Sequence, residues 1–181
     1  MAELKKNQDQ EELFRTIYKI ATDLVHAGHV AEWDFKSYVL GTMFYRYISE
    51  NFTEYVNKGE WDAGNPDFDY TKMSDADAEV AREGLIEEKG FFILPSELFC
   101  NVRARADKDD NLNETLERIF KNIEASARGS ESEKCFAGLF NDFDVNNNKL
   151  GATVARRNER LVKLLDGIAD MDLGDMMDHH K

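Results

Sequence analysis

The sequence predicts an all-α fold, a helical bundle with one short extended or β segment near residues 91–94. Three observations support this class. Apolar residues recur every three or four positions over much of the chain, which is the spacing of one helix face. Only two prolines occur in 181 residues, and both are isolated. The 42% hydrophobic and 11% aromatic content is enough for a sizeable core.

The first part of the chain is predicted to form two helices. Asp9 and Glu12 make a capping box before an amphipathic pattern that stops at Gly28. The next block follows a possible cap at Asp34, is apolar or aromatic around most of its circumference, and ends near Gly59. We expect this second helix to be central and mostly buried.

Turn-forming residues divide the middle of the chain. The acidic stretch 60–77 predicts a loop, and Ser74 can cap a helix that runs to about Lys89 and ends at Gly90. The apolar run "GFFILPSELF" then predicts the extended segment, because Pro95 disfavours helix in the residue before it.

The second half predicts three more helices. Their apolar residues at helical spacing are Leu112, Leu116, Ile119, Phe120 and Ile123 in the first, Phe136, Leu139 and Phe140 in a short second, and Leu161, Leu164, Leu165 and Ile168 in the last. No internal repeat or low-complexity tract separates these segments.

The overall charge bounds the possible partners. A net charge of -13 and a pI near 4.7 disfavour a free-standing nucleic-acid binder, so any DNA contact needs a local patch or a partner.

Cys100 and Cys135 lack the spacing of a metal site or a redox motif, and both are expected to be reduced. Without an apolar leader or a membrane-length apolar run, we expect a soluble, cytoplasmic protein with no membrane partner.

The stretch "NDFDVNNNKLG" raises the question of calcium. Its oxygen-bearing side chains alternate as in a calcium loop, at Asp142, Asp144, Asn146 and Asn148. The twelfth position is Thr153 where such loops carry a bidentate Glu, and the eighth is Lys149, whose charge opposes a cation. These differences favour an Asn-rich turn between helices over a calcium site.

Catalytic and metal motifs are largely absent from the sequence. It contains no GxGxxG, GxxxxGK[ST], HExxH or GxSxG pattern and no Asn-Pro-Pro element. His26 and His29 could share a metal, but no third ligand lies near them, so surface or cap positions are favoured. The sequence therefore predicts no catalytic, cofactor-binding or metal-binding residue in this chain.

One basic cluster contrasts with the acidic average. Its members are Lys149, Arg156, Arg157, Arg160 and Lys163. They share their fifteen residues with one acid, Glu159, so the local charge is five minus one, or +4. Positions 156, 160 and 163 fall on one helix face, which could follow a DNA phosphate backbone or oppose an acidic partner. The alternative is a solvated basic face opposite the apolar face of the same helix.

Two weaker candidates remain for nucleic-acid contact. Arg103 and Arg105 precede an acidic loop and form a second, smaller basic group. Aromatic side chains that could stack on bases are Tyr38, Tyr45, Tyr47, Phe52 and Tyr55. A buried core stripe explains these aromatic residues better, because they share a long apolar helix.

Four blocks in order resemble one family. They are "IYKIATDLVHAGHVAEWDFKSYVLGTMFYRYISENF", "KGFFILPSELF", "NLNETLERIFKNIEAS" and "CFAGLFNDFDVNNNKLG", and they cover nearly the whole chain. This order resembles the N-terminal helical domain of the methyltransferase (modification) subunit of type I restriction-modification systems. In that resemblance the Asn-rich run is an interhelical turn that leads into the Arg-rich helix.

The resemblance implies a domain that assists catalysis performed elsewhere. Residues 1–170 would be the N-terminal helical domain, and 171–181 a linker toward an absent catalytic domain. The full-length subunit would be an adenine-specific DNA methyltransferase that uses S-adenosylmethionine and modifies adenine N6. This chain lacks the family's cofactor loop and Asn-Pro-Pro motif, so no catalytic residue is carried over and no cofactor is expected in this part.

The implied partners are double-stranded DNA, the specificity subunit, a second methyltransferase subunit and, in the full complex, the restriction subunit. We expect the domain to clamp DNA through the basic cluster and to join the specificity subunit. The alternative function is a pure protein-protein interaction module without DNA contact, in which the negative charge keeps the domain off DNA.

Overall fold

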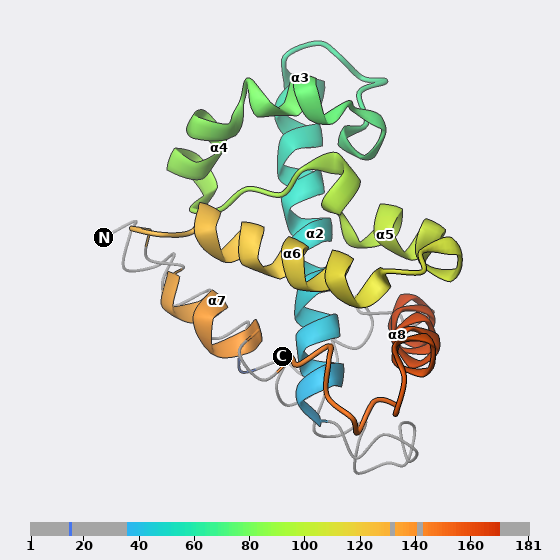
Figure 1. Cartoon of the computed structure of the whole chain (residues 1–181). Helices are drawn as coiled ribbons and strands as arrows, with labels where there is room; N and C mark the ends of the chain where they lie inside the picture. Colours follow the sequence, from blue (N-terminus) through green and yellow to red (C-terminus); the bar gives the residue numbers. More distant parts are fainter. Residues whose placement is uncertain (1–14, 16–35, 131–132, 141–142, 171–181) are drawn as a thin grey trace.

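The structure, a computed structural model, consists of helices and connecting turns, with no strand among the residues it describes (Figure 1). These residues are 15, 36–130, 133–140 and 143–170. In chain order the elements are α2 (Lys36–Asp62), η1 (Tyr70–Lys72), α3 (Asp75–Glu79), α4 (Arg82–Lys89), η2 (Pro95–Glu97), α5 (Phe99–Arg105), η3 (Ala106–Lys108), α6 (Leu112–Ser126), α7 (Glu133–Phe140) and α8 (Val154–Ala169). The predicted all-α class is confirmed.

Helix α2 runs through the centre of the fold, and α5, α7 and α8 pack against it (Figure 1). Its Tyr45 and Phe52 side chains are completely buried. The Tyr45 ring meets the rings of Phe99 and Phe120 edge-on, and the Phe52 ring meets that of Tyr70 in the same way. A helix with neighbours on several sides needs apolar side chains around most of its circumference. The prediction of a central helix is confirmed. The predicted burial holds for the first half of α2, whereas between Thr53 and Asp62 only Asn57 is buried.

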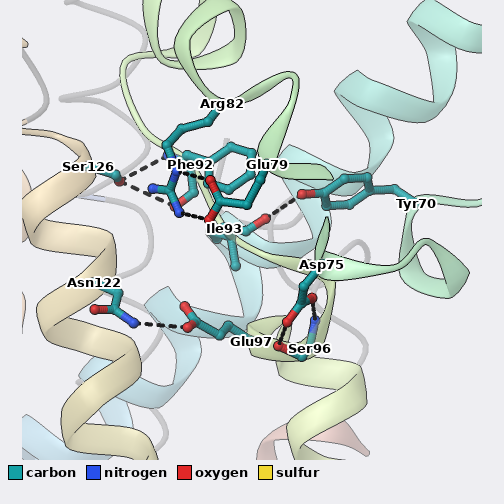
Figure 2. A network of polar contacts seen from close by, with 10 residues as sticks. All are labelled: Tyr70, Asp75, Glu79, Arg82, Phe92, Ile93, Ser96, Glu97, Asn122 and Ser126. Atoms are coloured by element: carbon teal, nitrogen blue, oxygen red, sulfur yellow. Dashed lines mark hydrogen bonds and ion pairs between the residues drawn. The ribbon is translucent and has the colours of Figure 1, made fainter. Parts of the chain in front are cut away.

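The predicted extended segment at residues 91–94 follows Gly90, whose left-handed backbone (φ 85°) ends α4. Backbone groups of Phe92 and Ile93 in this segment form hydrogen bonds with side chains and not with a second strand. The Phe92 N–H donates to Ser126 Oγ at 3.0 Å, and the Tyr70 hydroxyl donates to the Ile93 carbonyl at 2.6 Å (Figure 2). Buried backbone groups need such partners, so α6 and η1 hold this segment in place.

The sequence predicts one helix up to Gly90 in the region of α3 and α4, and that prediction is wrong. The chain forms two short helices there. The Ala81 N–H donates to the Ala78 carbonyl at 3.0 Å, a three-residue spacing that tightens the turn between them. The guanidinium of Arg82, at the start of α4, lies 4.4 Å from the centroid of the Phe92 ring. A contact with the extended segment that follows α4 thus accompanies the break.

Helices α6, α7 and α8 confirm the helices predicted in the second half of the chain. The predicted helix that stops at Gly28, the cap at Asp34, and His26 and His29 lie outside the described residues. Within the described ranges, no helix combines the length and apolar character needed to cross a membrane.

Candidate nucleic-acid interface

The loop between α7 and α8 is an Asn-rich turn, as predicted. The Asp144 carboxylate accepts a hydrogen bond from the backbone N–H of Asn146 at 3.0 Å, and the Asn147 side-chain oxygen accepts one from Lys149 N–H at 2.9 Å. Such side-chain contacts two residues ahead are the reason that Asp and Asn favour turns. Asp144, one of the oxygen-bearing positions of the calcium pattern, therefore acts here as a local acceptor within the turn. Asp142, the first calcium position, lies outside the described residues.

The start of α8 is tied closely to this loop. Thr153 caps the helix, with its Oγ1 accepting from the Arg156 N–H at 3.3 Å. Gly151 lies against the first turn of the helix. A Cβ atom at this position would lie 2.6 Å from the Arg156 Cβ. The small residue lets the loop approach the helix backbone, so the loop and the basic helix form one local unit.

One face of α8 is buried in the fold, and its apolar members are Leu161, Leu164, Leu165 and Ile168. Asn158 lies on the same buried side and makes two polar contacts. Its Oδ1 accepts from the Asn113 N–H at 3.0 Å, and its Nδ2 donates to the Asp110 carbonyl at 2.8 Å. These bonds join the buried side of α8 to the start of α6. A polar residue at a core-facing helical position was the only sequence signal for this role.

The opposite face of α8 carries three of the predicted basic residues. Arg156, Arg160 and Lys163 are exposed, and we call these three residues the basic stripe. They lie at i, i+4 and i+7, so they share one side of the helix. The Arg156 side chain is 73% exposed, and its guanidinium lies 4.0 Å from the Glu159 carboxylate, a contact of little energy at such exposure. Lys149, in the preceding loop, is exposed as well.

Arg157 differs from the rest of the cluster because it is half-buried and bonded to its own loop. Its Nε donates to the Gly151 carbonyl at 2.9 Å, and its Nη2 donates to the Asn148 side-chain oxygen at 2.9 Å. These contacts give Arg157 a structural role. Its role as a phosphate contact stays a prediction, as do the roles of the four exposed cations.

The second basic group, Arg103 and Arg105, is engaged within the domain. Arg103 Nε lies 3.0 Å from an oxygen of Asp166 near the end of α8. Arg105 donates to the Ser96 carbonyl at 2.6 Å and to the Asn101 carbonyl at 3.2 Å. These side chains join α5 to its surroundings, which makes them weaker candidates for a nucleic-acid contact than the basic stripe.

The aromatic side chains of α2 belong mainly to the core. Tyr38, Tyr45 and Phe52 are at most 4% exposed, which confirms the core interpretation for these three. Tyr47 is half-buried, and Tyr55 is 39% exposed with its hydroxyl donating to the Glu88 carboxylate at 2.6 Å. Most of the aromatic residues that could stack on bases are therefore inaccessible to a nucleic acid.

One buried carboxylate could not be selected from any sequence pattern. Glu97 in η2 is 7% exposed and accepts a hydrogen bond of 2.9 Å from the Asn122 amide of α6 (Figure 2). Burial raises the pKa of this carboxyl, while the Asn122 hydrogen bond and the charge of Arg118 lower it in part. The side chain connects two elements and lies apart from the basic stripe in sequence. Nothing in its local pattern distinguishes it from a surface Glu.

Comparison with known proteins places the whole arrangement in a family. Residues 13–168 match the family described as HsdM N-terminal domain. The methylase subunit of the type I restriction enzyme MpnII from Mycoplasma pneumoniae is 41% identical over an alignment of 178 residues that covers 94% of this chain and 32% of that protein.

A solved structure shares the fold. It is the methyltransferase subunit of a type I restriction-modification system from Streptococcus thermophilus, with a TM-score of 0.62 at 23% identity over 93% of this chain and 37% of that one. The chain thus spans about a third of the length of these two proteins. It belongs to the HsdM N-terminal domain family, the helical N-terminal domain of type I restriction-modification methylase subunits.

Proposed function

We propose that this domain holds DNA for a type I methylase and joins the methylase to its specificity subunit. The observation that carries the proposal is the basic stripe, three exposed cations on a helix whose other face is anchored in the fold. From Arg156 to Lys163 the stripe covers about 10 Å of helix axis, at about 1.5 Å per residue. One DNA strand places a phosphate about every 3.4 Å along the duplex axis. The stripe can therefore contact neighbouring phosphates.

Methylation of a base inside a duplex explains why such a hold is useful. The full-length subunit is proposed to transfer a methyl group from S-adenosylmethionine to adenine N6 in the cytoplasm. That nitrogen lies within the base stack, so the base must be flipped out at a cost of about a few kcal/mol while the duplex is held. Phosphate contacts position DNA without reading its sequence. We assign recognition of the DNA sequence to the specificity subunit. The other proposed partners are a second methylase subunit and the restriction subunit.

The test uses the reconstituted complex of full-length methylase and specificity subunits. Arg156, Arg160 and Lys163 are changed together to Gln, and DNA affinity is measured against salt concentration. Loss of three phosphate contacts should weaken binding and reduce the slope of log K against log salt by about three. A control with Lys58, Lys72 and Arg128 changed to Gln removes the same charge outside α8 and its loop. Unchanged affinity and slope in the α8 variant would reject the DNA contact.

The second candidate is a protein-protein interaction module without DNA contact, and the net charge of -13 favours it. Such a charge repels phosphates, so the basic stripe would then contact an acidic surface of a partner subunit. A pull-down with the specificity subunit in the absence of DNA distinguishes the two functions. Under the alternative, the α8 variant loses the specificity subunit without DNA. Under the DNA-holding function, it retains the subunit and loses only DNA affinity.

A further inference from the structure

A groove opens on the surface between the second half of α2 and the start of α5, and we call it the α2–α5 groove. Its volume is about 250 Å³, and residues that line it include Glu50, Thr53, Glu54, Trp61, Phe99 and Cys100. Small-molecule sites usually enclose about 300–1,000 Å³. The size of the groove therefore suits one or two side chains of a docking protein segment better than a cofactor.

The apolar floor of the groove is held in a fixed position. Leu98 is completely buried and Phe99 nearly so. The Ser49 hydroxyl of α2 accepts a hydrogen bond from the Phe99 N–H at 3.1 Å, which ties the start of α5 to α2. Because this bond joins residues 50 positions apart in the chain, the groove is a product of tertiary packing and is already formed before any partner arrives.

Trp61 forms an exposed apolar wall. Its side chain is 47% exposed although its indole N–H already donates to the Phe68 carbonyl at 2.9 Å. The indole nitrogen is the only polar group of this side chain, so the surface left to solvent is apolar. Tryptophan is enriched at protein interfaces, where its large ring supplies apolar contact area.

The rim of the groove is acidic. Glu50 and Glu54 are both exposed. Arg46 pairs with Glu50 at 2.8 Å, whereas no ion pair of Glu54 occurs within the described part of the chain. Partial burial raises the pKa of the Cys100 thiol, and the charges of Asp69 and Glu50 raise it further. The exposed carboxylates of Glu50 and Glu54 give the rim a negative potential, which favours a cationic ligand group.

We propose that the α2–α5 groove binds a basic, partly apolar segment of a partner protein, with an apolar side chain against Phe99 and Trp61 and an Arg or Lys directed to Glu54. This inference rests on the proposed assembly role of the domain. An Arg side chain fits both surfaces, because its planar head stacks on indole rings and pairs with carboxylates. The negative potential opposes nucleic acid, and the charge of -13 opposes a second copy of this chain.

The first test compares variants in the reconstituted complex of full-length methylase and specificity subunits. Glu54→Lys reverses a rim charge that has no ion pair among the described residues, and it should weaken association at least tenfold. Trp61→Ala should do the same. The matched controls are Glu87→Lys, an exposed carboxylate on α4, and Val80→Ala, an 89% exposed apolar side chain. Both controls should associate normally. Since Trp61→Ala removes a hydrogen bond, thermal melts check its fold, and Glu54→Lys tests the groove independently.

The second test uses the Cys100 thiol as a probe of the groove. Alkylation of Cys100 by N-ethylmaleimide is followed by peptide mass spectrometry. The partner subunit should slow the reaction at least fivefold, while DNA alone or a high concentration of the methylase subunit should not. Normal association of Glu54→Lys together with unprotected Cys100 would overturn the groove proposal, as would protection by DNA or by self-association.

The two tests also separate this inference from the function on which it rests. If the complex forms normally while Cys100 is alkylated at an unchanged rate, the groove proposal is rejected and the assembly role is unaffected. Failure of the unaltered subunits to associate rejects the assembly role, and the groove proposal falls with it. DNA binding by the basic stripe is measured with different variants and is affected by neither result.

Discussion

The guanidinium of Arg157 donates a hydrogen bond of 2.9 Å to the backbone carbonyl of Gly151 and so ties the first turn of α8 to the preceding loop. The neighbouring Arg156 is 73% exposed in its side chain. Two adjacent residues of the same type therefore occupy different environments, because a single step along a helix rotates the side chain by about 100°.

Replacing these two arginines separately should give different losses of stability. Arg157→Ala removes two hydrogen bonds from a charged donor to Gly151 and Asn148. Such bonds contribute about 1.5–3 kcal/mol when sheltered, and partial exposure reduces this, so we expect a loss of about 1–2 kcal/mol. Arg156→Ala should stay within about 0.5 kcal/mol. Urea unfolding of both variants is the measurement, and equal losses would contradict the structural role of Arg157.

The buried carboxyl of Glu97 should make stability depend on pH. Burial raises its folded-state pKa above the ordinary value of 4.5. The folded state therefore binds the proton more tightly than the unfolded chain, and the free energy of unfolding falls as pH rises from the ordinary value through the raised one. Glu97→Gln removes this titration and can still accept from Asn122 through its amide oxygen.

The stability of Glu97→Gln relative to the unaltered chain should thus increase as pH rises through that window and then level off. Urea unfolding at a series of pH values measures the difference, with Glu87→Gln as an exposed control. A difference that does not change with pH, or one that shrinks as pH rises, would show that burial does not dominate at this carboxyl.

Two glycines in the same helix should respond oppositely to the same substitution. A Cβ at Gly41 would lie 2.7 Å from Cδ2 of Phe143, whose ring also meets the rings of Tyr38 and Phe120 at centroid distances of 5.0 Å. A Cβ at Gly59 meets nothing within 4 Å. Gly59→Ala should stabilise the domain by about 0.5–1 kcal/mol through helix propensity.

Gly41→Ala has the same gain in helix propensity, but its methyl group must displace the Phe143 ring, which is packed between two other rings. Overpacking of this kind costs about 1–3 kcal/mol. We therefore expect a net destabilisation. Thermal unfolding of the two variants side by side is the measurement. Similar increases in melting temperature at both positions would show that the Phe143 ring moves away freely.

The extended segment 91–94 should depend on the Ser126 hydroxyl. This oxygen accepts from the Phe92 N–H at 3.0 Å (Figure 2) and donates to the Ile123 carbonyl at 2.6 Å. Ser126→Ala leaves a buried N–H without its acceptor, which costs about 1–3 kcal/mol. Amide hydrogen exchange at Phe92 should accelerate with the loss of stability. Unchanged exchange would mean that the segment is held without this bond.

Local patterns in the sequence were sufficient for several features. Apolar spacing predicted α6 and α8, Gly90 predicted the end of α4 through its left-handed backbone, and the run around Asn147 predicted a turn. The spacing of Arg156, Arg160 and Lys163 also placed them on one face. Each of these features depends on residues within a few positions of one another, where backbone geometry and side-chain type act directly.

Tertiary structure decided the rest. The burial of Glu97 and the α2–α5 groove depend on contacts with other segments. Glu97 and Asn122 are 25 positions apart, and Ser49 and Phe99 are 50 apart. A charged or polar residue has the same appearance in the sequence whether it faces solvent or a neighbouring helix. Only the packing of the whole chain determines which polar residues lose their contact with water. The free-energy cost of burying such a residue depends on the partners that it finds there.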